Sequence, residues 1–173
     1  EYGPILDFPG LEWSSTNALS YRDANIANDE SIEQYARLVD VQSIDDLIAL
    51  NAEYQGQPLF NTVAADDLGN VWYADASATP NLSDEASGAF VGQLFSDPVT
   101  KLAFDRGFVL LDGTDSRFRR EVVPGARDPG LVPFDAMPKV QRNDYVFNAN
   151  DSYWIPNAES PLTGDYSFLH GTQ

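Results

Sequence analysis

The chain has 173 residues, and 27 acidic against 10 basic side chains give it a net charge of −17 at neutral pH. A negative charge of this size argues against nucleic acid or an anionic membrane as a partner, because both attract clustered lysine and arginine. With no cysteine in the sequence, thiol catalysis, zinc–thiolate sites and disulfides are excluded. The hydrophobic content of 43% is enough to bury one core, so residues 1–173 are predicted to form a single domain.

Two amphipathic helices are predicted after an extended N-terminal segment. The first begins at Asp29 or Ser31, and the second begins at Ser43, whose hydroxyl can cap it. Gly56 is predicted to end the second helix, because glycine tolerates the left-handed conformation there. Each helix carries side chains at helical spacing that we expect to face the core. They are Ile32, Tyr35, Ala36 and Val39 in the first helix, and Ile44, Leu47, Ile48 and Asn51 in the second.

A β-hairpin near residues 59–75 gives the clearest strand signal. Residues 59–66 and 71–75 are rich in side chains that favour strands. Between them lies a turn in which Gly69 can supply a positive φ. The pattern therefore predicts two antiparallel strands that are neighbours in one sheet.

A second helical pair is predicted over residues 84–95 and 97–106, where Pro98 suits the first turn of the second helix. Residues 108–111 are a short apolar run and are predicted to form a buried strand. Residues 117–138 are rich in proline and glycine, which predicts a long irregular loop. Helical pairs mixed with a hairpin and separate short strands indicate an α+β fold.

The irregular loop is also basic. Half of the ten basic residues lie in it or directly after it: Arg117, Arg119, Arg120, Arg127 and Lys139. On an acidic chain such a loop most often forms local ion pairs, and the alternatives are an anionic ligand and a partner subunit. Beyond the loop, residues 145–150 are predicted to form a strand. Residues 162–173 are predicted to form a tail that exposes the only histidine, His170.

Acidic pairs occur at two predicted helix starts and in the hairpin turn, where the helix dipole and turn hydrogen bonds explain them. These pairs are Asp45–Asp46, Asp84–Glu85 and Asp66–Asp67. Two carboxylates brought together by folding can also hydrolyse glycosides, so a small carboxylate-pair hydrolase stays an open alternative. The turn residues Asp66, Asp67 and Asn70 resemble a calcium loop only faintly, because they lack the ordered ligand spacing of an EF-hand.

Residues 148–154 read Asn-Ala-Asn-Asp-Ser-Tyr-Trp and combine carboxamides with large aromatic side chains. If the preceding strand continues to Asn150, the side chains of Asn148 and Asn150 point to the same face. Neutral side-chain amides can donate hydrogen bonds to a developing negative charge, as an oxyanion hole requires. The alternative interpretation is an Asx turn that ends the strand.

Four ordered segments resemble the penicillin acylase family, in particular its branch of acyl-homoserine lactone acylases and aculeacin acylases. Together they span nearly the whole chain, and four segments in order are far more specific than one. The segments are residues 2–5 (Tyr-Gly-Pro-Ile), 19–25 (ending Arg-Asp-Ala-Asn), 56–75 (the hairpin, with Asn-Thr and Ala-Asp) and 142–164 (with Asn-Ala-Asn-Asp-Ser and Pro-Leu-Thr-Gly).

The resemblance implies an N-terminal-nucleophile amide hydrolase that folds as an αββα sandwich, is secreted or periplasmic, and matures by self-cleavage of a precursor. The implied substrate is a small N-acyl compound such as a penicillin or an N-acyl-homoserine lactone. Residue by residue, the resemblance makes Asn150 the oxyanion-hole side chain and Asn148 its neighbour. It assigns Phe60, Leu59 and, as a weaker candidate, Tyr35 to the acyl pocket. No cofactor is required by it, although a structural calcium with unassigned ligands is a family feature.

The chain also departs from the family pattern. Tyr2 stands where the family has histidine, and the family's nucleophile and active-site arginine have no counterpart in the sequence. We therefore expect an internal segment of a β-chain, inactive alone, whose partners are the rest of that β-chain and its α-chain. The other open alternative is a stand-alone acidic module that binds carbohydrate on aromatic side chains, with candidates Trp13, Trp72, Tyr153 and Trp154.

Overall fold

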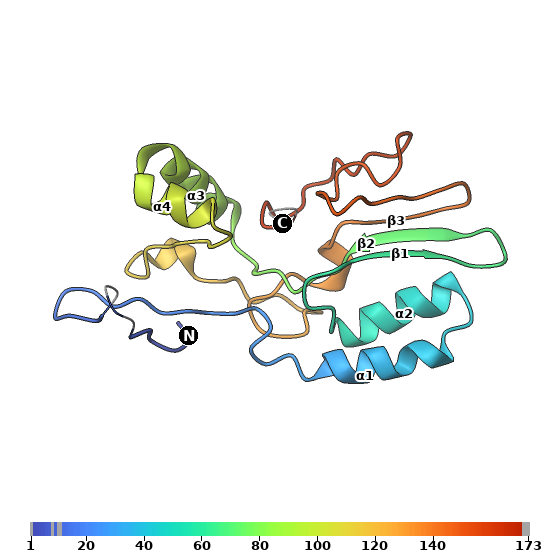
Figure 1. The fold of residues 1–173 in the computed structure, drawn as a ribbon, viewed down its shortest axis with the longest axis horizontal. Helices are drawn as coiled ribbons and strands as arrows, with labels where there is room; N and C mark the ends of the chain where they lie inside the picture. The colour runs from blue at the N-terminus through green and yellow to red at the C-terminus, as the bar shows by residue number, and fades with distance from the viewer. Residues whose placement is uncertain (1, 8, 10–11, 171–173) are drawn as a thin grey trace.

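The computed structural model describes residues 2–7, 9 and 12–170. Helices and one small sheet alternate along the chain and are joined by long loops, so the predicted α+β class is confirmed (Figure 1). In chain order the elements are α1 (Glu30–Arg37), η1 (Leu38–Asp40), α2 (Ile44–Tyr54), β1 (Asn61–Ala65), β2 (Val71–Asp75), α3 (Asp84–Ser96), α4 (Pro98–Phe104), η2 (Ser116–Phe118), η3 (Phe134–Ala136) and β3 (Lys139–Arg142).

The sheet has three antiparallel strands in the order β1-β2-β3. The predicted hairpin joins β1 to β2, with Asn61 opposite Asp75, and Gly69 in its turn has φ +86°. β3 lies on the other side of β2, with Val71 opposite Arg142. Figure 1 shows the helices α1 and α2 on one side of this sheet and the C-terminal segment on the other.

β2 is almost entirely buried, and its two faces differ. Trp72 and Ala74 belong to an apolar cluster formed with α2 and with residues 132–137. Tyr73 and Asp75 alternate with them and therefore point to the opposite side of the sheet, where Asp75 meets the C-terminal segment. The helical face of the strand is thus apolar and the other face is polar.

A second apolar cluster lies between α3, α4 and η2. At its centre the fully buried Phe90 meets Phe104 of α4 edge-on, with 5.7 Å between ring centres, and stacks on Phe168 at 5.5 Å. Phe118 of η2 belongs to the same cluster. Through Phe168, the C-terminal segment contacts this cluster as well as the sheet.

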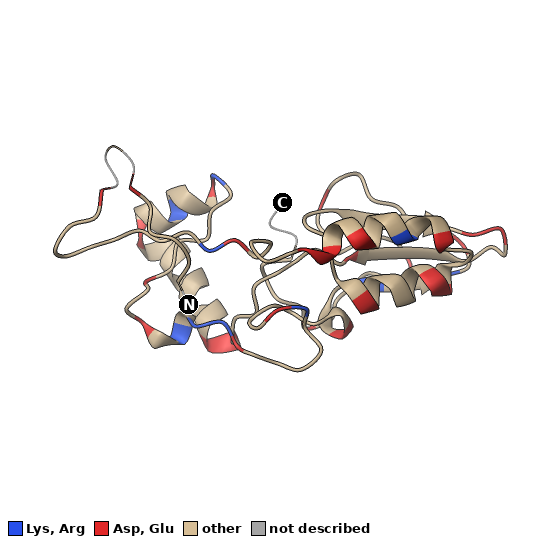
Figure 2. Cartoon of the chain, turned by 90° about the horizontal axis from the view of Figure 1, so that it is seen from below, with Lys and Arg blue, Asp and Glu red and all other residues tan. Residues whose placement is uncertain are grey.

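Charged side chains are mostly on the surface, and Figure 2 shows acidic residues along α1 and α2. The basic loop forms the local ion pairs that its composition predicts. Arg117 pairs with Asp115 at 2.6 Å and Arg127 with Asp128 at 2.8 Å. Lys139 donates to backbone carbonyls in and after η3. In the described part of the chain, no helix is both long and apolar enough to cross a membrane.

The helix boundaries follow the predicted caps, but the buried face of α1 does not follow its apolar spacing. Ser43 accepts the N–H of Asp46 at 3.1 Å, as predicted for the start of α2. However, Ile32 of α1 and Val39 of the following η1 are each 82% exposed, and Gln34 is the buried residue of α1. Gln34 is buried because its side chain bonds to the buried Asn51 of α2 at 3.0 Å. A polar contact between the helices replaces the predicted apolar one.

The prediction that Gly56 ends α2 by taking the left-handed conformation is wrong. Gln55 takes the left-handed conformation after α2, with φ +48°. Gly56 is required for a different reason, because a Cβ on it would lie 2.8 Å from the backbone nitrogen of Ser31. The absence of a side chain at Gly56 therefore lets the two helices approach.

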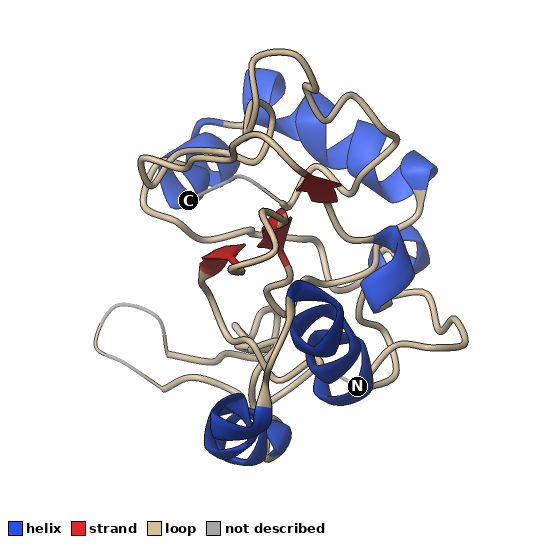
Figure 3. Cartoon of the chain, turned by 90° about the vertical axis from the view of Figure 1, so that its right-hand side faces the viewer, coloured by secondary structure: helices blue, strands red, loops and turns tan. Residues whose placement is uncertain are grey.

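The strands predicted at residues 108–111 and 145–150 are also wrong. Both segments are loops, and Figure 3 shows the strands gathered in one group. Residues 145–150 instead pair locally with the chain that follows them, since Phe147 donates its N–H to the carbonyl of Pro156 at 2.8 Å. The expected burial of residues 108–111 is wrong as well, because Phe108 is 58% exposed and Val109 is 38% exposed.

Glycine-to-alanine substitutions give a test of the helix contact. We expect Gly56→Ala to destabilise the chain by about 1–3 kcal/mol, because the new methyl group overlaps backbone atoms. Gly88→Ala is the matched control: no atom lies within 4 Å of its added Cβ. This change should stabilise α3 by about 0.5–1 kcal/mol. Urea unfolding of both variants measures the difference, and equal midpoints would contradict the close approach at Gly56.

Candidate functional site

A tight turn at residues 148–151 contains two of the predicted site residues, Asn148 and Asn150. The Oδ1 atom of Asn148 accepts the backbone N–H of Asn150 at 2.9 Å, which is an Asx turn. The Nδ2 group of Asn148 donates to the backbone oxygen of Asp151 at 3.0 Å. Asn150 has φ +66°, a left-handed conformation that asparagine tolerates better than most residues. The Asx turn, the open alternative in the sequence, is the arrangement found.

This turn is connected to the sheet through side chains. Asn61, the first residue of β1, donates its Nδ2 group to Oδ1 of Asn148 at 3.3 Å. The hydroxyl of Tyr73 in β2 donates to Oδ1 of Asn61 at 2.9 Å. The Asx turn is therefore bonded to β1 directly and to β2 through Asn61, although both strands are far from it in sequence.

The loop that carries the turn is also held by its own contacts. Arg142 and Asp144 form an ion pair at 2.5 Å, and this pair holds the pKa of Asp144 well below its usual range. The fully buried Asn157 donates to the carbonyl of Tyr145 at 2.8 Å. These bonds join the two ends of the loop, so the turn lies on a supported segment although it contains no strand.

The side chains of Asn148 and Asn150 do not share one face of a strand, contrary to what the sequence predicted. Asn148 is half-buried, and its carboxamide is used inside the turn. Asn150 is exposed, and within the part of the chain that the structure describes its carboxamide bonds to no other group. The two side chains therefore have separate tasks: one shapes the turn, and the other is available to a ligand.

A cavity of about 680 Å³ opens beside the sheet. Leu59, two residues before β1, is part of its wall, together with several apolar side chains. A cavity of this volume is in the range of small-molecule sites. Most of its walls come from four segments: residues 18–24, 77–80, 107–111 and 118–120.

One side of this cavity is cationic. Arg22, Arg119 and Arg120 contribute to the wall, and Arg120 donates to the carbonyl of Arg22 at 3.0 Å. Burial and the nearby charge of Arg22 lower the pKa of Arg120 to about 10, and the opposing charge of Asp23 offsets part of their effect. Arg120 therefore stays positively charged at neutral pH, and the cavity joins apolar walls to a basic side.

The residues predicted for an acyl pocket are only partly brought together. Both Leu59 and Phe60 are exposed, and of the two only Leu59 lines the cavity. Tyr35 lies on α1, also outside the cavity, and its hydroxyl donates to Gln57 at 2.8 Å. Sequence reasoning did not identify Asn61 and Tyr73 as part of the site. The signal that could have found them is polarity: both are hydrogen-bonding residues at buried or half-buried positions of strands.

The prediction of an exposed His170 is wrong. Its side chain is buried, with Nδ1 at 3.4 Å from Oδ2 of Asp75 and 3.3 Å from the hydroxyl of Thr79. Burial raises the pKa of Asp75, but His170 and a hydrogen bond from Ser77 outweigh this effect and hold it below its ordinary value. The pair fixes the C-terminal segment to the end of β2. His170 therefore has a structural role on the polar face of the sheet.

The carbohydrate-binding alternative keeps only two of its four candidate side chains at the surface, Trp13 and Trp154. Trp72 and Tyr153, two of the four candidate sugar-stacking side chains, are buried.

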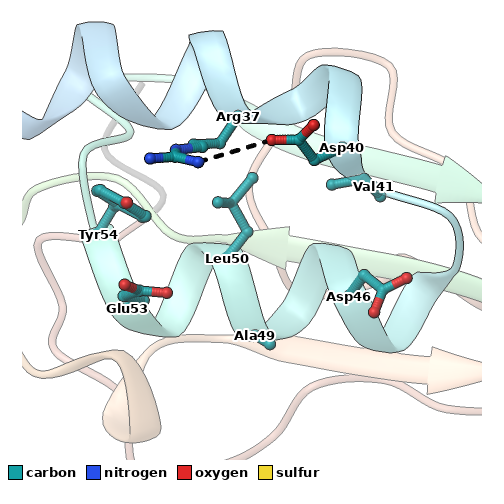
Figure 4. Close-up of a pocket in the computed structure, with 8 residues that line it drawn as sticks. All are labelled: Arg37, Asp40, Val41, Asp46, Ala49, Leu50, Glu53 and Tyr54. Carbon is teal, nitrogen blue, oxygen red and sulfur yellow. Dashed lines mark ion pairs between the residues drawn. The ribbon is translucent and has the colours of Figure 1, made fainter.

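A second hollow, of about 400 Å³, lies between α1 and α2. Arg37 at its rim is already paired with Asp40 (Figure 4), and it also pairs with Glu33. The lining residues of this hollow are Arg37, Asp40, Val41, Asp46, Ala49, Leu50, Glu53 and Tyr54.

Among the described residues, no three histidine, aspartate or glutamate side chains gather into a possible metal site. Asp66 in the hairpin turn accepts the N–H groups of Asn70 at 2.8 Å and Leu68 at 3.0 Å. These bonds account for its conformation, so a calcium loop is not needed to explain the turn.

Comparison with known proteins identifies relatives over the whole chain. A family model described as penicillin amidase matches residues 1–172. The acyl-homoserine lactone acylase PvdQ of Pseudomonas fluorescens (strain Pf0-1) is 34% identical over 165 residues, which are 95% of this chain and 20% of that protein. The PvdQ protein of Pseudomonas putida (strain KT2440) is 32% identical over the same shares. The aculeacin-A acylase of Actinoplanes utahensis is 30% identical over 94% of this chain and 20% of its own length.

The buried pair of Asp75 and His170 predicts a pH dependence of stability. Because the pKa of Asp75 is lowered on folding, the unfolded state binds more protons near the ordinary aspartate pKa. The stability due to Asp75 is therefore complete above that value and is lost as the pH falls through the lowered pKa. We expect Asp75→Asn to cost about 3 kcal/mol at neutral pH, since it breaks a buried pair.

The same substitution should also flatten the acid limb of the stability curve, measured by urea unfolding between about pH 2 and pH 7. Asp67→Asn, in the exposed hairpin turn, is the control. A curve for Asp75→Asn parallel to that of the unmodified chain would remove Asp75 from this account.

Proposed function

Because the chain belongs to the penicillin amidase family, we propose that it is a segment of an acylase that hydrolyses an N-acyl amide. The chain spans about a fifth of the length of the curated relatives it matches. In this proposal it supplies Asn150 to the oxyanion hole and part of the acyl pocket. The rest of a β-chain and an α-chain supply the nucleophile and the other pocket walls, and the segment alone is inactive.

The observation that carries the proposal is the conformation of Asn150. Its backbone is held in the left-handed region by the Asx turn, and its exposed carboxamide makes no other bond within the described residues. When a nucleophile attacks an amide carbonyl, the oxygen becomes negatively charged. A side-chain N–H that is already placed at that oxygen stabilises this charge without reorganisation. Asn150 has the chemistry and the freedom from other partners that this role requires.

The cavity beside Leu59 supports an acyl-binding role. Leu59 precedes Asn61 by two residues, and Asn61 bonds to Asn148 in the turn. The start of β1 therefore connects the cavity wall with the proposed oxyanion donor. Apolar walls suit the hydrocarbon part of an acyl group, which gains free energy when it leaves water. We propose a small N-acyl substrate; penicillins, N-acyl-homoserine lactones and acylated lipopeptides share the required amide.

Further features of the proposal follow from family membership. The complete protein is proposed to be a secreted or periplasmic N-terminal-nucleophile hydrolase with an αββα sandwich, matured by self-cleavage. Two exposed apolar side chains, Ile32 of α1 and Val39 of η1, support a contact with the remaining parent chain. No cofactor takes part in the proposed chemistry, and no step uses a metal ion.

Substitution of Asn150 in the full-length acylase tests the oxyanion role. Asn150→Gly removes the carboxamide while keeping a residue that accepts the positive φ. We expect turnover to fall about 10²- to 10³-fold, measured as release of free amine from phenylacetyl, short-chain and long-chain acyl amides. Asn143→Ala, which removes an exposed carboxamide from the same loop, should leave turnover unchanged. Unchanged turnover in Asn150→Gly would falsify the assignment, and amide hydrolysis by the 173-residue chain alone would overturn the segment proposal.

The acyl pocket has its own test. Leu59→Trp fills part of the cavity, so we expect KM for long acyl chains to rise about tenfold while short chains are little affected. Phe60→Ala is the comparison, because Phe60 lies outside the cavity. The reverse result, with chain-length preference changed by Phe60→Ala and not by Leu59→Trp, would move the acyl group to the other side of β1.

A further inference from the structure

Resting on the proposed function, we propose that Asn61 and Tyr73 are positioning residues that hold the carboxamide of Asn150 in place through the Asx turn. Neither residue touches the reacting atoms in this account. They act by fixing the orientation of Asn148, whose side chain sets the backbone of Asn150. The three hydrogen bonds of this relay connect the buried strand β2 with the exposed turn.

The relay runs through adjacent donors and acceptors. Tyr73 donates to Oδ1 of Asn61 at 2.9 Å, and Asn61 donates from Nδ2 to Oδ1 of Asn148 at 3.3 Å. The same Oδ1 atom accepts the N–H of Asn150 at 2.9 Å. One carboxamide oxygen therefore accepts both the bond from the sheet and the bond that closes the turn.

The direction of the relay is fixed at Tyr73. Its side chain is completely buried, and burial raises the pKa of its hydroxyl, with the charges of Asp75 and Asp151 adding to the shift. The hydroxyl therefore stays protonated and remains a donor. Because Oδ1 of Asn61 faces this donor, the amide of Asn61 cannot turn over without losing a hydrogen bond. Its Nδ2 group is thereby directed at Asn148.

The positive φ of Asn150 makes such support necessary. A left-handed residue other than glycine is less stable than a right-handed one. The turn bond from Asn148 offsets this cost only while its Oδ1 atom points at the N–H of Asn150. The bond from Asn61 holds that atom in place from the sheet side, and the bonds from Nδ2 of Asn148 to Asp151 hold the other end of the carboxamide.

The side chain of Asn61 has no part in the strand ladder. Its backbone pairs with Asp75 in the antiparallel register, and this pairing needs only main-chain atoms. The carboxamide is left to bond across the sheet to Tyr73 and outward to Asn148. A variant at this position can therefore lose the relay while the hairpin stays paired.

Double-mutant kinetics in the full-length acylase test the proposal. We expect Asn61→Ala and Tyr73→Phe each to lower kcat about five- to tenfold, as for the loss of one hydrogen bond, with KM within about twofold of the unmodified value. In the Asn150→Gly background neither change should lower kcat further, because the positioned group is absent. A purely structural role would lower activity equally in both backgrounds, and that result would overturn the proposal.

Two controls keep the outcomes separate. Asn70→Ala removes a carboxamide from the opposite end of the same hairpin, and Tyr54→Phe removes a hydroxyl from α2; both should leave kcat unchanged. If Asn61→Ala fails to mature, Tyr73→Phe still tests the relay, since it keeps the buried ring. If Asn150→Gly lowers turnover but Asn61→Ala and Tyr73→Phe do not, only the relay is wrong. If Asn150→Gly itself has no effect, the proposed function is wrong.

Discussion

Burial of β2 on both faces is the constraint on which the rest of this structure depends. On the helical face the constraint is met by apolar packing, with Trp72 and Ala74 in one cluster with α2. On the other face the strand presents a tyrosine hydroxyl and a carboxylate, and buried polar groups are costly unless they are hydrogen-bonded. Asn61 bonds to Tyr73, and His170 with Ser77 contacts Asp75. The need to satisfy two polar groups thus brings a turn and the C-terminal segment to the same face of the sheet.

The hairpin and the helix boundaries could be predicted from the sequence because their causes are local. Ser43 bonds to an N–H three residues later, and Gly69 supplies the positive φ of its own turn. The burial of His170 could not be predicted in this way, since its partner Asp75 is far away in sequence. The same holds for Gln34, whose burial depends on Asn51 in another helix. Polar pairs of this kind produce no periodic pattern in the amino-acid sequence.

For the candidate site, the sequence identified the residue types and missed what supports them. The resemblance to the penicillin acylase family is confirmed, and it drew attention to Asn148 and Asn150. The local pattern left two possibilities open: a strand continued to Asn150, and an Asx turn that ends the strand. Tertiary contacts decide between them, because Asn148 uses its carboxamide within the turn and towards Asn61. A side chain engaged on both sides cannot also face a ligand, so the two asparagines have different tasks.

The site therefore combines two kinds of support. The turn at Asn150 is joined by hydrogen bonds to Asn61 of β1 and, through Asn61, to Tyr73 of the buried strand β2, so its position is tied to the sheet. The cavity beside Leu59 is walled largely by loops, which tolerate substitution more readily than buried strands. In an acylase this division has a consequence for specificity. Under the proposed function, changes in the cavity wall would alter which acyl chain binds without moving Asn150, the proposed oxyanion donor, whereas changes on the polar face of β2 would affect the chemistry for every acyl chain alike.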